Sequence, residues 1–353
     1  MWAMVLKEFR QLRRDRRTLA MIIVMPLLLL IVFGYAASFD VSEIPTAVLG
    51  PEADSVAEAF PDTFSVEQTD PQLGRARADE LLMEGEVVVA VVADPEDPVI
   101  LVDGSELFSA REAQAAFARA GEGGFPAAVR VLYNPELETS AIMVPGLAGL
   151  ILLFVGTVTT SLGVVRERQA GTLEQLAVMP ISPSDVFIGK VAPYFLVAAI
   201  DLAAIIGVGV AIFDVPFNGS LLTLGLGALL FLFVTLGTGV LISGVSENQG
   251  QAIQLALMIL LPQVLLSGLI FPLESMPAGV RWIGYALPLT YFIQISRGVM
   301  LRGAPLESVA EPMLLLAAIG LVVFALAVLR FRKDLAPAGG ARATKTREAV
   351  AVP

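Results

Sequence analysis

Six long apolar runs constrain this chain more than any other feature of its sequence. A helix needs about 20 predominantly apolar residues to cross the hydrocarbon core of a bilayer. Only 16% of the residues are charged, against roughly 25% in soluble domains. We therefore predict an α-helical membrane protein with six transmembrane helices. The apolar runs are 18–37, 141–165, 191–213, 220–245, 252–271 and 312–329.

A seventh apolar stretch, 282–296, is shorter than the other six. Pro288 interrupts it, and Arg281 and Arg297 bracket it. We expect a re-entrant hairpin over 276–302 that dips into the membrane surface. A seventh transmembrane helix is the alternative.

Lys and Arg residues near the spans set the orientation, because they are enriched on the cytoplasmic side. Fifteen lie before the first span, between the second and third spans, or after the sixth, and only three lie in the other short loops. Six spans therefore place both termini in the cytoplasm. The three in the other loops are Arg281, Arg297 and Arg302.

The two ends of the chain carry separate expectations. The run 18–37 is too long for the apolar part of a signal peptide, and a segment of helical character precedes it, so we expect an uncleaved anchor. The segment 141–335 should hold five further membrane helices. The stretch 336–353 is rich in Ala, Gly, Pro and charged residues, and we expect a disordered cytoplasmic tail.

The residue types that are missing exclude several kinds of site. The chain contains no Cys and no His, which removes thiol catalysis, Cys-ligated zinc and the commonest general base. The Gly189-Lys190 pair lacks the following Ser or Thr and the earlier Gly of a phosphate-binding loop. We expect no catalytic residue, metal site, cofactor or nucleic-acid partner on this chain, so any ATP must be hydrolysed by another protein.

Residues 38–140 form the one long polar segment, which the topology places outside the cytoplasm. They include 21 Asp and Glu, five Arg and no Lys. Strand and helix patterns alternate, which predicts a small α/β domain. The expected strands are 45–49, 64–67, 87–93, 99–102 and 129–133, and the expected helices are 53–60, 73–83 and 105–120, the last with Ser105 as N-cap. The run Asp94–Asp97 is either an acidic turn or a cation site, and it lacks the spacing of a calcium-binding loop.

The segment 1–17 has the pattern of an amphipathic helix. Basic residues occupy the face opposite to an apolar stripe, as in helices that lie in the cytoplasmic membrane interface and contact anionic lipid. Alternatively, the basic residues serve only to set the topology. The apolar stripe consists of Trp2, Val5, Leu6, Phe9 and Leu12.

The loop after the second span encodes a short, separately capped helix. Gly171 ends the preceding helix, Thr172 and Gln175 have the spacing of a capping box, and Pro180 ends the new helix. Leu173 and Leu176 then share an apolar face. A partner protein could cover this face, and the membrane surface is the alternative.

At this loop the sequence resembles the permease subunits of the ABC-type 2 exporter family. The resemblance rests on the runs 166–176, 179–183, 267–277 and 287–291, on Arg297-Gly298, and on 134–136 followed by 144–146. It extends over nearly the whole chain. Gln169 and Ala170 depart from it, because many relatives carry charged residues there.

The resemblance implies a function for several segments. Such permeases have six spans, form dimers and work with a cytoplasmic ATPase dimer that binds ATP and Mg²⁺. It further implies that 171–180 is a coupling helix, that 1–17 is an interfacial gate helix, and that the hairpin 276–302 closes the outer mouth. The residues implied in ATPase coupling are Glu167, Gly171, Thr172, Leu173, Glu174, Gln175 and Leu176.

Three polar residues lie deep within predicted spans. Asp201 could line a substrate path, pair with another helix or stay protonated, and a structural role is somewhat favoured. Gln254 and Gln263 are further candidates for a substrate path, although hydrogen bonds between helices explain such residues more often.

These observations lead to one main hypothesis and two rivals. The first is the permease subunit, a homodimer, of an ATP-driven exporter of drug-like or lipid-like amphiphiles in the cytoplasmic membrane of a prokaryote. The second is a membrane receptor whose acidic outer domain binds a ligand, although the sequence has no recognisable output domain. The third is an ion-coupled transporter, which normally has several carboxylates within the membrane and internal repeats.

Overall fold

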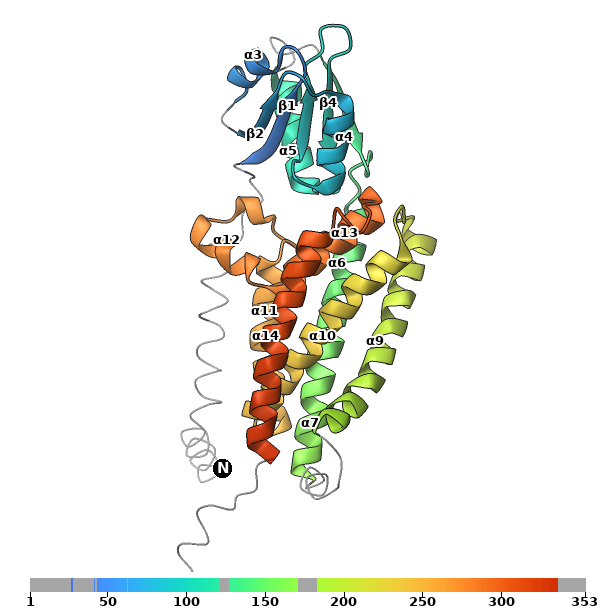
Figure 1. Ribbon diagram of the computed structural model, residues 1–353, viewed down its shortest axis with the longest axis vertical. Coiled ribbons are helices and arrows are strands. Elements are labelled where there is room, and N and C mark those ends of the chain that lie inside the picture. Colours follow the sequence, from blue (N-terminus) through green and yellow to red (C-terminus); the bar gives the residue numbers. More distant parts are fainter. Residues whose placement is uncertain are drawn as a thin grey trace, which may run out of the picture.

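The structure, a computed structural model, describes residues 27, 41, 43–61, 63–120, 127–170 and 183–335. An α/β domain stands on one end of a bundle of long helices (Figure 1). We call this end of the bundle the domain end, and the opposite end, which contains Ala170 and Pro183, the loop end. The expected interfacial helix, first span, coupling helix and tail lie outside the described residues, apart from Leu27 in the first span.

A mixed five-stranded sheet forms the centre of the α/β domain. Its order is β2-β1-β3-β4-β5, and the pairs are parallel except for antiparallel β3 and β4. Val91 of β3 lies opposite both Val48 of β1 and Ile100 of β4. The strands are β1 Ile44–Leu49, β2 Phe64–Asp70, β3 Val89–Val92, β4 Val99–Asp103 and β5 Ala128–Leu132.

Helices cover both faces of this sheet. Helices α3 (Ala53–Glu58) and α5 (Leu107–Ala120) pack on one face, and α4 (Arg75–Glu84) packs on the other. Because β3 and β4 are covered on both sides, they read as continuous apolar runs rather than as alternating ones. The predicted mixture of strands and helices is therefore confirmed.

The structure corrects several boundaries within the domain. Strand β2 is longer than expected and ends at Asp70, and α4 begins at Arg75 rather than at residue 73. Helix α4 ends at Glu84 and is followed by Gly85, whose φ of 75° favours glycine. Ser105 is not the N-cap of α5, because the helix begins two residues later, at Leu107.

Five helical segments of the described chain are long and apolar enough to cross a membrane. They overlap the second to sixth apolar runs, although the helix of the third run begins at Pro183 rather than at residue 191, and the helix of the fifth run ends at Leu266 rather than at residue 271. The first segment, Thr139–Gln169, consists of α6 (Thr139–Phe154), the π-turn η1 (Val155–Thr159) and α7 (Thr160–Gln169). The others are α9 (Pro183–Phe213), α10 (Leu221–Val245), α11 (Gln249–Leu266) and α14 (Ala310–Leu335).

The apolar stretch 282–296 forms two short helices at the domain end. They are α12 (Ala278–Tyr285) and α13 (Pro288–Arg297), and the π-turn η3 (Gly298–Arg302) continues the second. Neither helix reaches spanning length. Pro288 occupies the first turn of α13, where a missing N–H does no harm. We call the segment from α12 to η3 the hairpin.

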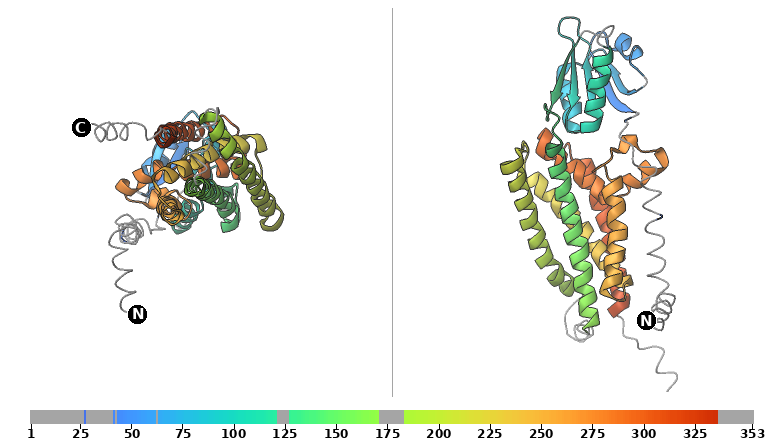
Figure 2. Two further views of the ribbon diagram at one scale, coloured as in Figure 1. Left: turned by 90° about the horizontal axis from the view of Figure 1, so that it is seen from below. Right: turned by 180° about the vertical axis from the view of Figure 1, so that it is seen from behind.

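Helix α10 is the central helix of the bundle (Figures 1 and 2). At the domain end, its Phe231 stacks on Phe292 of α13 with ring centroids 4.7 Å apart. Further down, η1 approaches α10 closely, since Thr157 Oγ1 donates a hydrogen bond of 3.4 Å to the Thr235 carbonyl oxygen. Gly156 permits this approach, because a β-carbon there would overlap the side chain of Thr235.

This close approach predicts a position-specific effect of one methyl group. Gly156→Ala should destabilise the protein by about 1–3 kcal/mol, because the added carbon forces η1 away from α10. The measurement is the thermal unfolding midpoint of the detergent-solubilised protein. Gly225→Ala on α10 is the matched control, since nothing lies within 4 Å of its added β-carbon. Equal midpoints for the two variants would contradict the packing argument.

Candidate functional site

Two arginines fix the loop end of the bundle. Arg168 Nη1 donates hydrogen bonds to the carbonyl oxygens of Ser243 (2.8 Å) and Ser246 (3.0 Å). Arg330 donates to the Gly244 carbonyl oxygen through Nε (3.2 Å) and Nη2 (2.7 Å). Both therefore satisfy the free carbonyl groups at the C-terminus of α10, where a positive charge is also favoured by the helix dipole.

The last turn of α7 also meets the start of α11. Gln249 Nε2 donates a hydrogen bond of 3.1 Å to Gln169 Oε1, so one of the two residues that depart from the family pattern has a partner within this chain. Glu167, which was predicted to contact the ATPase, lies half-buried in the same turn. The other predicted coupling residues, Gly171 to Leu176, and the apolar stripe Trp2 to Leu12 lie outside the described residues.

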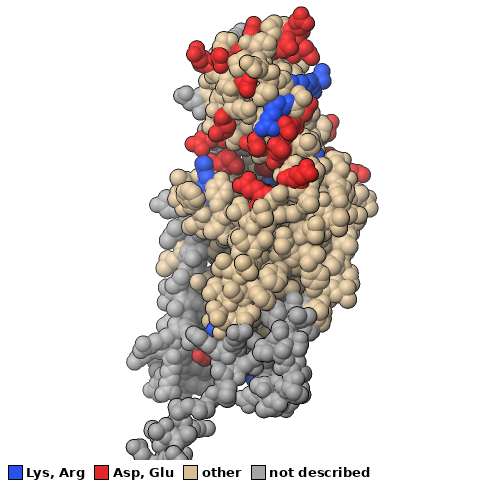
Figure 3. Space-filling model, viewed as in Figure 1, with Lys and Arg blue, Asp and Glu red and all other residues tan. Residues whose placement is uncertain are grey.

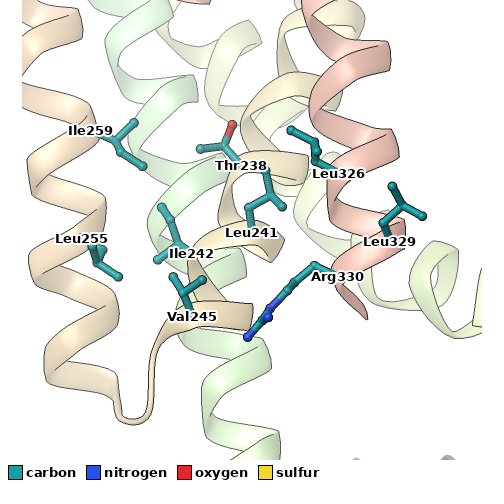
Figure 4. A pocket seen from close by; sticks show the side chains of 9 residues that line it. All are labelled: Thr238, Leu241, Ile242, Val245, Leu255, Ile259, Leu326, Leu329 and Arg330. Carbon is teal, nitrogen blue, oxygen red and sulfur yellow. The ribbon is translucent and has the colours of Figure 1, made fainter. Parts of the chain in front are cut away.

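An apolar groove opens between α10, α11 and α14 near the loop end (Figure 4). Its volume is about 510 Å³. Aliphatic side chains form most of its wall, and Arg330 at its lower end is the one charged residue among them. The lining residues are Thr238, Leu241, Ile242, Val245, Leu255, Ile259, Leu326, Leu329 and Arg330.

The three polar residues predicted within the spans do not come together. Asp201 is half-buried on α9 and forms no hydrogen bond or ion pair among the described residues. The buried Gln263 accepts a hydrogen bond of 3.3 Å from the Leu289 backbone N–H and thereby joins α11 to α13. The Oε1 atom of Gln254 is buried without a hydrogen-bond partner in the described part of the chain.

At the domain end, each arginine of the hairpin pairs with a carboxylate of the α/β domain or with Glu43, which directly precedes β1. Arg281 Nη1 lies 3.1 Å from Glu43, Arg297 Nη1 lies 3.4 Å from Glu106, and Arg302 Nη1 lies 3.3 Å from Asp103. These are the three basic residues of the loops 214–219 and 272–311. Figure 3 shows how strongly Asp and Glu otherwise predominate over the surface of the domain.

The Arg302–Asp103 pair is almost completely buried. The side chains are 8% and 1% exposed. Arg302 Nη1 also approaches Ser105 Oγ at 3.4 Å, and its guanidinium lies against Gly85 at the C-terminus of α4, where a β-carbon would be only 2.8 Å from both Nη atoms. A negative helix end and a carboxylate therefore surround the same guanidinium.

Arg297 links the domain to two parts of the bundle. It ends α13, pairs with Glu106, and donates through Nη2 to the Gly268 carbonyl oxygen at 3.3 Å. Burial raises the pKa of Glu106 to about 7, with Glu274 and Asp103 adding to the rise while Arg297 and Arg302 oppose it. Glu106 therefore titrates close to neutral pH.

A short, tightly held connection joins the domain to α6. The buried Asn134 side chain donates to the carbonyl oxygens of Gly104 (3.2 Å) and Glu138 (3.1 Å), and its Oδ1 accepts from the Glu138 N–H (3.0 Å). Arg111 of α5 donates to the Leu137 carbonyl oxygen at 2.9 Å. Tyr133 and Leu137 both have positive φ angles, 67° and 49°, so this connection follows one specific path.

The acidic turn at Asp94–Asp97 borders a separate cleft. This cleft has a volume of about 270 Å³ and lies where β1, β2 and β3 end, and Arg75 is among its lining residues. Among the described residues, no group of three or more acidic side chains is placed to hold a metal ion. The Glu96 N–H instead donates to Asp94 Oδ1 at 2.9 Å, which is the geometry of a simple turn.

Titration of Glu106 predicts a pH dependence of stability. In the folded protein the pKa of Glu106 is about 7, above the ordinary value of 4.5. The stabilisation of the folded state by the protonated carboxyl is therefore fully present below pH 4.5 and is lost as the pH rises through 7. Raising the pH from about 5 to about 8 should therefore lower the thermal midpoint of the wild type more than that of Glu106→Gln. Glu112→Gln, which opens an ion pair within α5, should follow the wild type. Parallel profiles for wild type and Glu106→Gln would refute the assignment.

Comparison with known proteins identifies the family. Residues 16–329 match the family described as "ABC-2 family transporter protein". The chain is 31% identical over 350 residues to the "Probable multidrug ABC transporter permease YbhS" of Escherichia coli K12, an alignment that covers 89% of this chain and 92% of that protein. It is 27% identical over 346 residues to YbhR of the same organism, which has the same description (88% and 92% covered). It is 33% identical over 214 residues to the "Inner membrane transport permease YhhJ" (58% and 55% covered). This chain therefore belongs to the ABC-2 family of transporter permeases.

Proposed function

We propose that this chain is the permease subunit of an ATP-driven exporter that moves amphiphilic, drug-like or lipid-like molecules out of a prokaryotic cell. Two relatives that share almost the full length are described as multidrug permeases. In this proposal two copies form the transmembrane path, and a separate cytoplasmic ATPase dimer binds ATP and Mg²⁺.

The domain lies at one end of the bundle, and the end of α7 and the start of α9, which flank the segment 171–182, lie at the other. This is the observation that carries the proposal. The helix Thr139–Gln169 leaves the domain and ends where the predicted coupling segment begins. A segment that docks on a cytoplasmic ATPase must lie on the opposite side of the membrane from an extracytoplasmic domain. Together with the basic residues near both termini and the apolar run 18–37, this arrangement supports six spans, cytoplasmic termini and an extracytoplasmic domain.

The apolar groove supports an amphiphilic substrate. Its walls are almost entirely aliphatic, and Arg330 at the loop end is the one charge. Such a surface favours molecules with a large apolar body and a polar end, and it offers little to a small hydrophilic solute. The short helices α12 and α13 fit the proposed role of the hairpin as a closure of the outer mouth.

The proposed orientation in the membrane predicts a pattern of chemical labelling. The chain has no Cys, so single substitutions Thr172→Cys and Asp94→Cys each give one labelling site. A membrane-impermeant maleimide applied to intact cells, with the outer membrane permeabilised where one exists, should label Asp94→Cys. It should label Thr172→Cys only after the cytoplasmic membrane is also opened. Labelling of both positions from the same side would overturn the orientation.

The proposed docking of the ATPase on the coupling helix predicts the effect of two substitutions. Leu173→Asp or Leu176→Asp should abolish co-purification of the ATPase, because a carboxylate on the apolar face of the coupling helix would have to be buried at the contact. Leu306→Asp is the matched control, since Leu306 is 48% exposed in a loop at the domain end. Retention of the ATPase by both loop variants would show that the docking site lies elsewhere.

A further inference from the structure

The α/β domain contacts two elements that the proposed transport cycle must connect. One is the helix Thr139–Gln169, which runs from the domain to the coupling segment. The other is the hairpin at the proposed outer mouth (Figure 1). A helix of 31 residues is about 46 Å long, so it reaches from one membrane surface to the other.

The link between the domain and this helix is stiff. Asn134 is 5% exposed, and its amide bridges Gly104 after β4 to Glu138 at the start of α6. The buried Asn134 side chain makes three hydrogen bonds, so its loss would leave several buried polar groups unpaired. Arg111 adds a further bond from α5 to the same connection. A rotation of α6 must therefore rotate the domain as well.

The link between the domain and the hairpin is equally direct. Three ion pairs cross it, at Arg281, Arg297 and Arg302. The Arg302–Asp103 pair is buried, and separating a buried pair leaves a charge in a poorly solvated site. Asn218, in the α9–α10 connection, donates to the Leu301 carbonyl oxygen at 2.7 Å and so fixes the same π-turn from the bundle side.

We propose that the α/β domain is a lever of the outer gate, which moves with the hairpin as one body and transmits to it the motion of the helix Thr139–Gln169. This inference rests on the proposed function, because the motion begins at the ATPase. It assigns gating roles to Asn134, Arg297 and Arg302, which position the moving parts and need not touch the substrate.

A tethered receptor domain would be built differently. It would join the membrane part through a flexible linker and would keep its charged residues free for a ligand. Here six residues separate the end of β5 at Leu132 from the start of α6 at Thr139, and buried hydrogen bonds hold them. The carboxylates Glu43, Asp103 and Glu106 are engaged by the hairpin.

Spin-label distances in the complex with the ATPase test the lever. Labels at Glu96→Cys and Gly279→Cys report the distance between domain and hairpin within one chain, when labelled chains are diluted with unlabelled ones. Glu96 is an exposed turn residue, and a β-carbon at Gly279 meets nothing within 4 Å. A single label at Gly279→Cys reports the distance between the two hairpins of a dimer.

For the wild type, we expect the Glu96–Gly279 distance to be narrow and unchanged by ATP with vanadate, whereas the Gly279–Gly279 distance shifts. The variant with Glu43→Gln, Asp103→Asn and Glu106→Gln loses the acidic partner of every hairpin arginine. It should show a broadened Glu96–Gly279 distance and a loss of the ATP-dependent shift, while the bound ATPase continues to hydrolyse ATP.

Glu112→Gln, which opens the Arg119 pair on the surface of α5, is the control and should behave as the wild type. If the triple variant fails to fold, Glu106→Gln alone should give a smaller change in the same direction. A Glu96–Gly279 distance that changes with ATP in the wild type, or a full shift in the weakened variants, would overturn the lever. Failure of the ATPase to bind the wild type would instead contradict the proposed function, and the distance without nucleotide would still test the ion pairs.

Discussion

Burial of Arg302 against Asp103 fixes the position of the α/β domain on the helical bundle. With side chains 8% and 1% exposed, neither group retains enough water to be stable alone, and breaking such a pair by removing one partner costs about 3–5 kcal/mol. The pair between Arg281 and Glu43 is more exposed, at 25% and 60%, so it adds little energy but helps to define the orientation. The arginines of the hairpin and the carboxylates that face them are therefore complementary in position as well as in sign.

The regular elements could be predicted because each bears a local pattern. Continuous apolar runs gave five of the membrane helices, and β-branched runs gave β3 and β4. The errors occur where tertiary contacts decide the boundary. Ser105 could not be excluded as an N-cap from sequence, because its hydroxyl lies near Arg302, almost 200 residues away along the chain. The π-turns η1 and η3 likewise have no local signal, since they depend on packing against α10 and the domain.

The candidate site was only partly accessible to sequence analysis for the same reason. The capped loop and its apolar face are local features, so the sequence could predict them, and they lie outside the described residues. The ion pairs at the domain end join residues that are separated by about 190 to 240 positions, so no motif could reveal them. One signal was present: all three basic residues of the loops 214–219 and 272–311 lie within the predicted hairpin, and the segment 38–140 has a large excess of carboxylates. Charge complementarity between these two segments would have been a sound expectation.

The packing of η1 determines whether the helix Thr139–Gln169 can transmit a displacement along its whole length. A π-turn interrupts the regular hydrogen bonds of a helix and is a natural place to bend. Here the turn is held by Gly156 and Thr157 against Thr235, and Gly239 lets α10 approach the Thr157 carbonyl oxygen. In the proposed lever, this contact lets α10 support the π-turn, so that a displacement at Arg168 would reach Asn134. Separation of α10 from η1 would make the two halves of the helix independent and would disconnect the hairpin from the ATPase in this proposal.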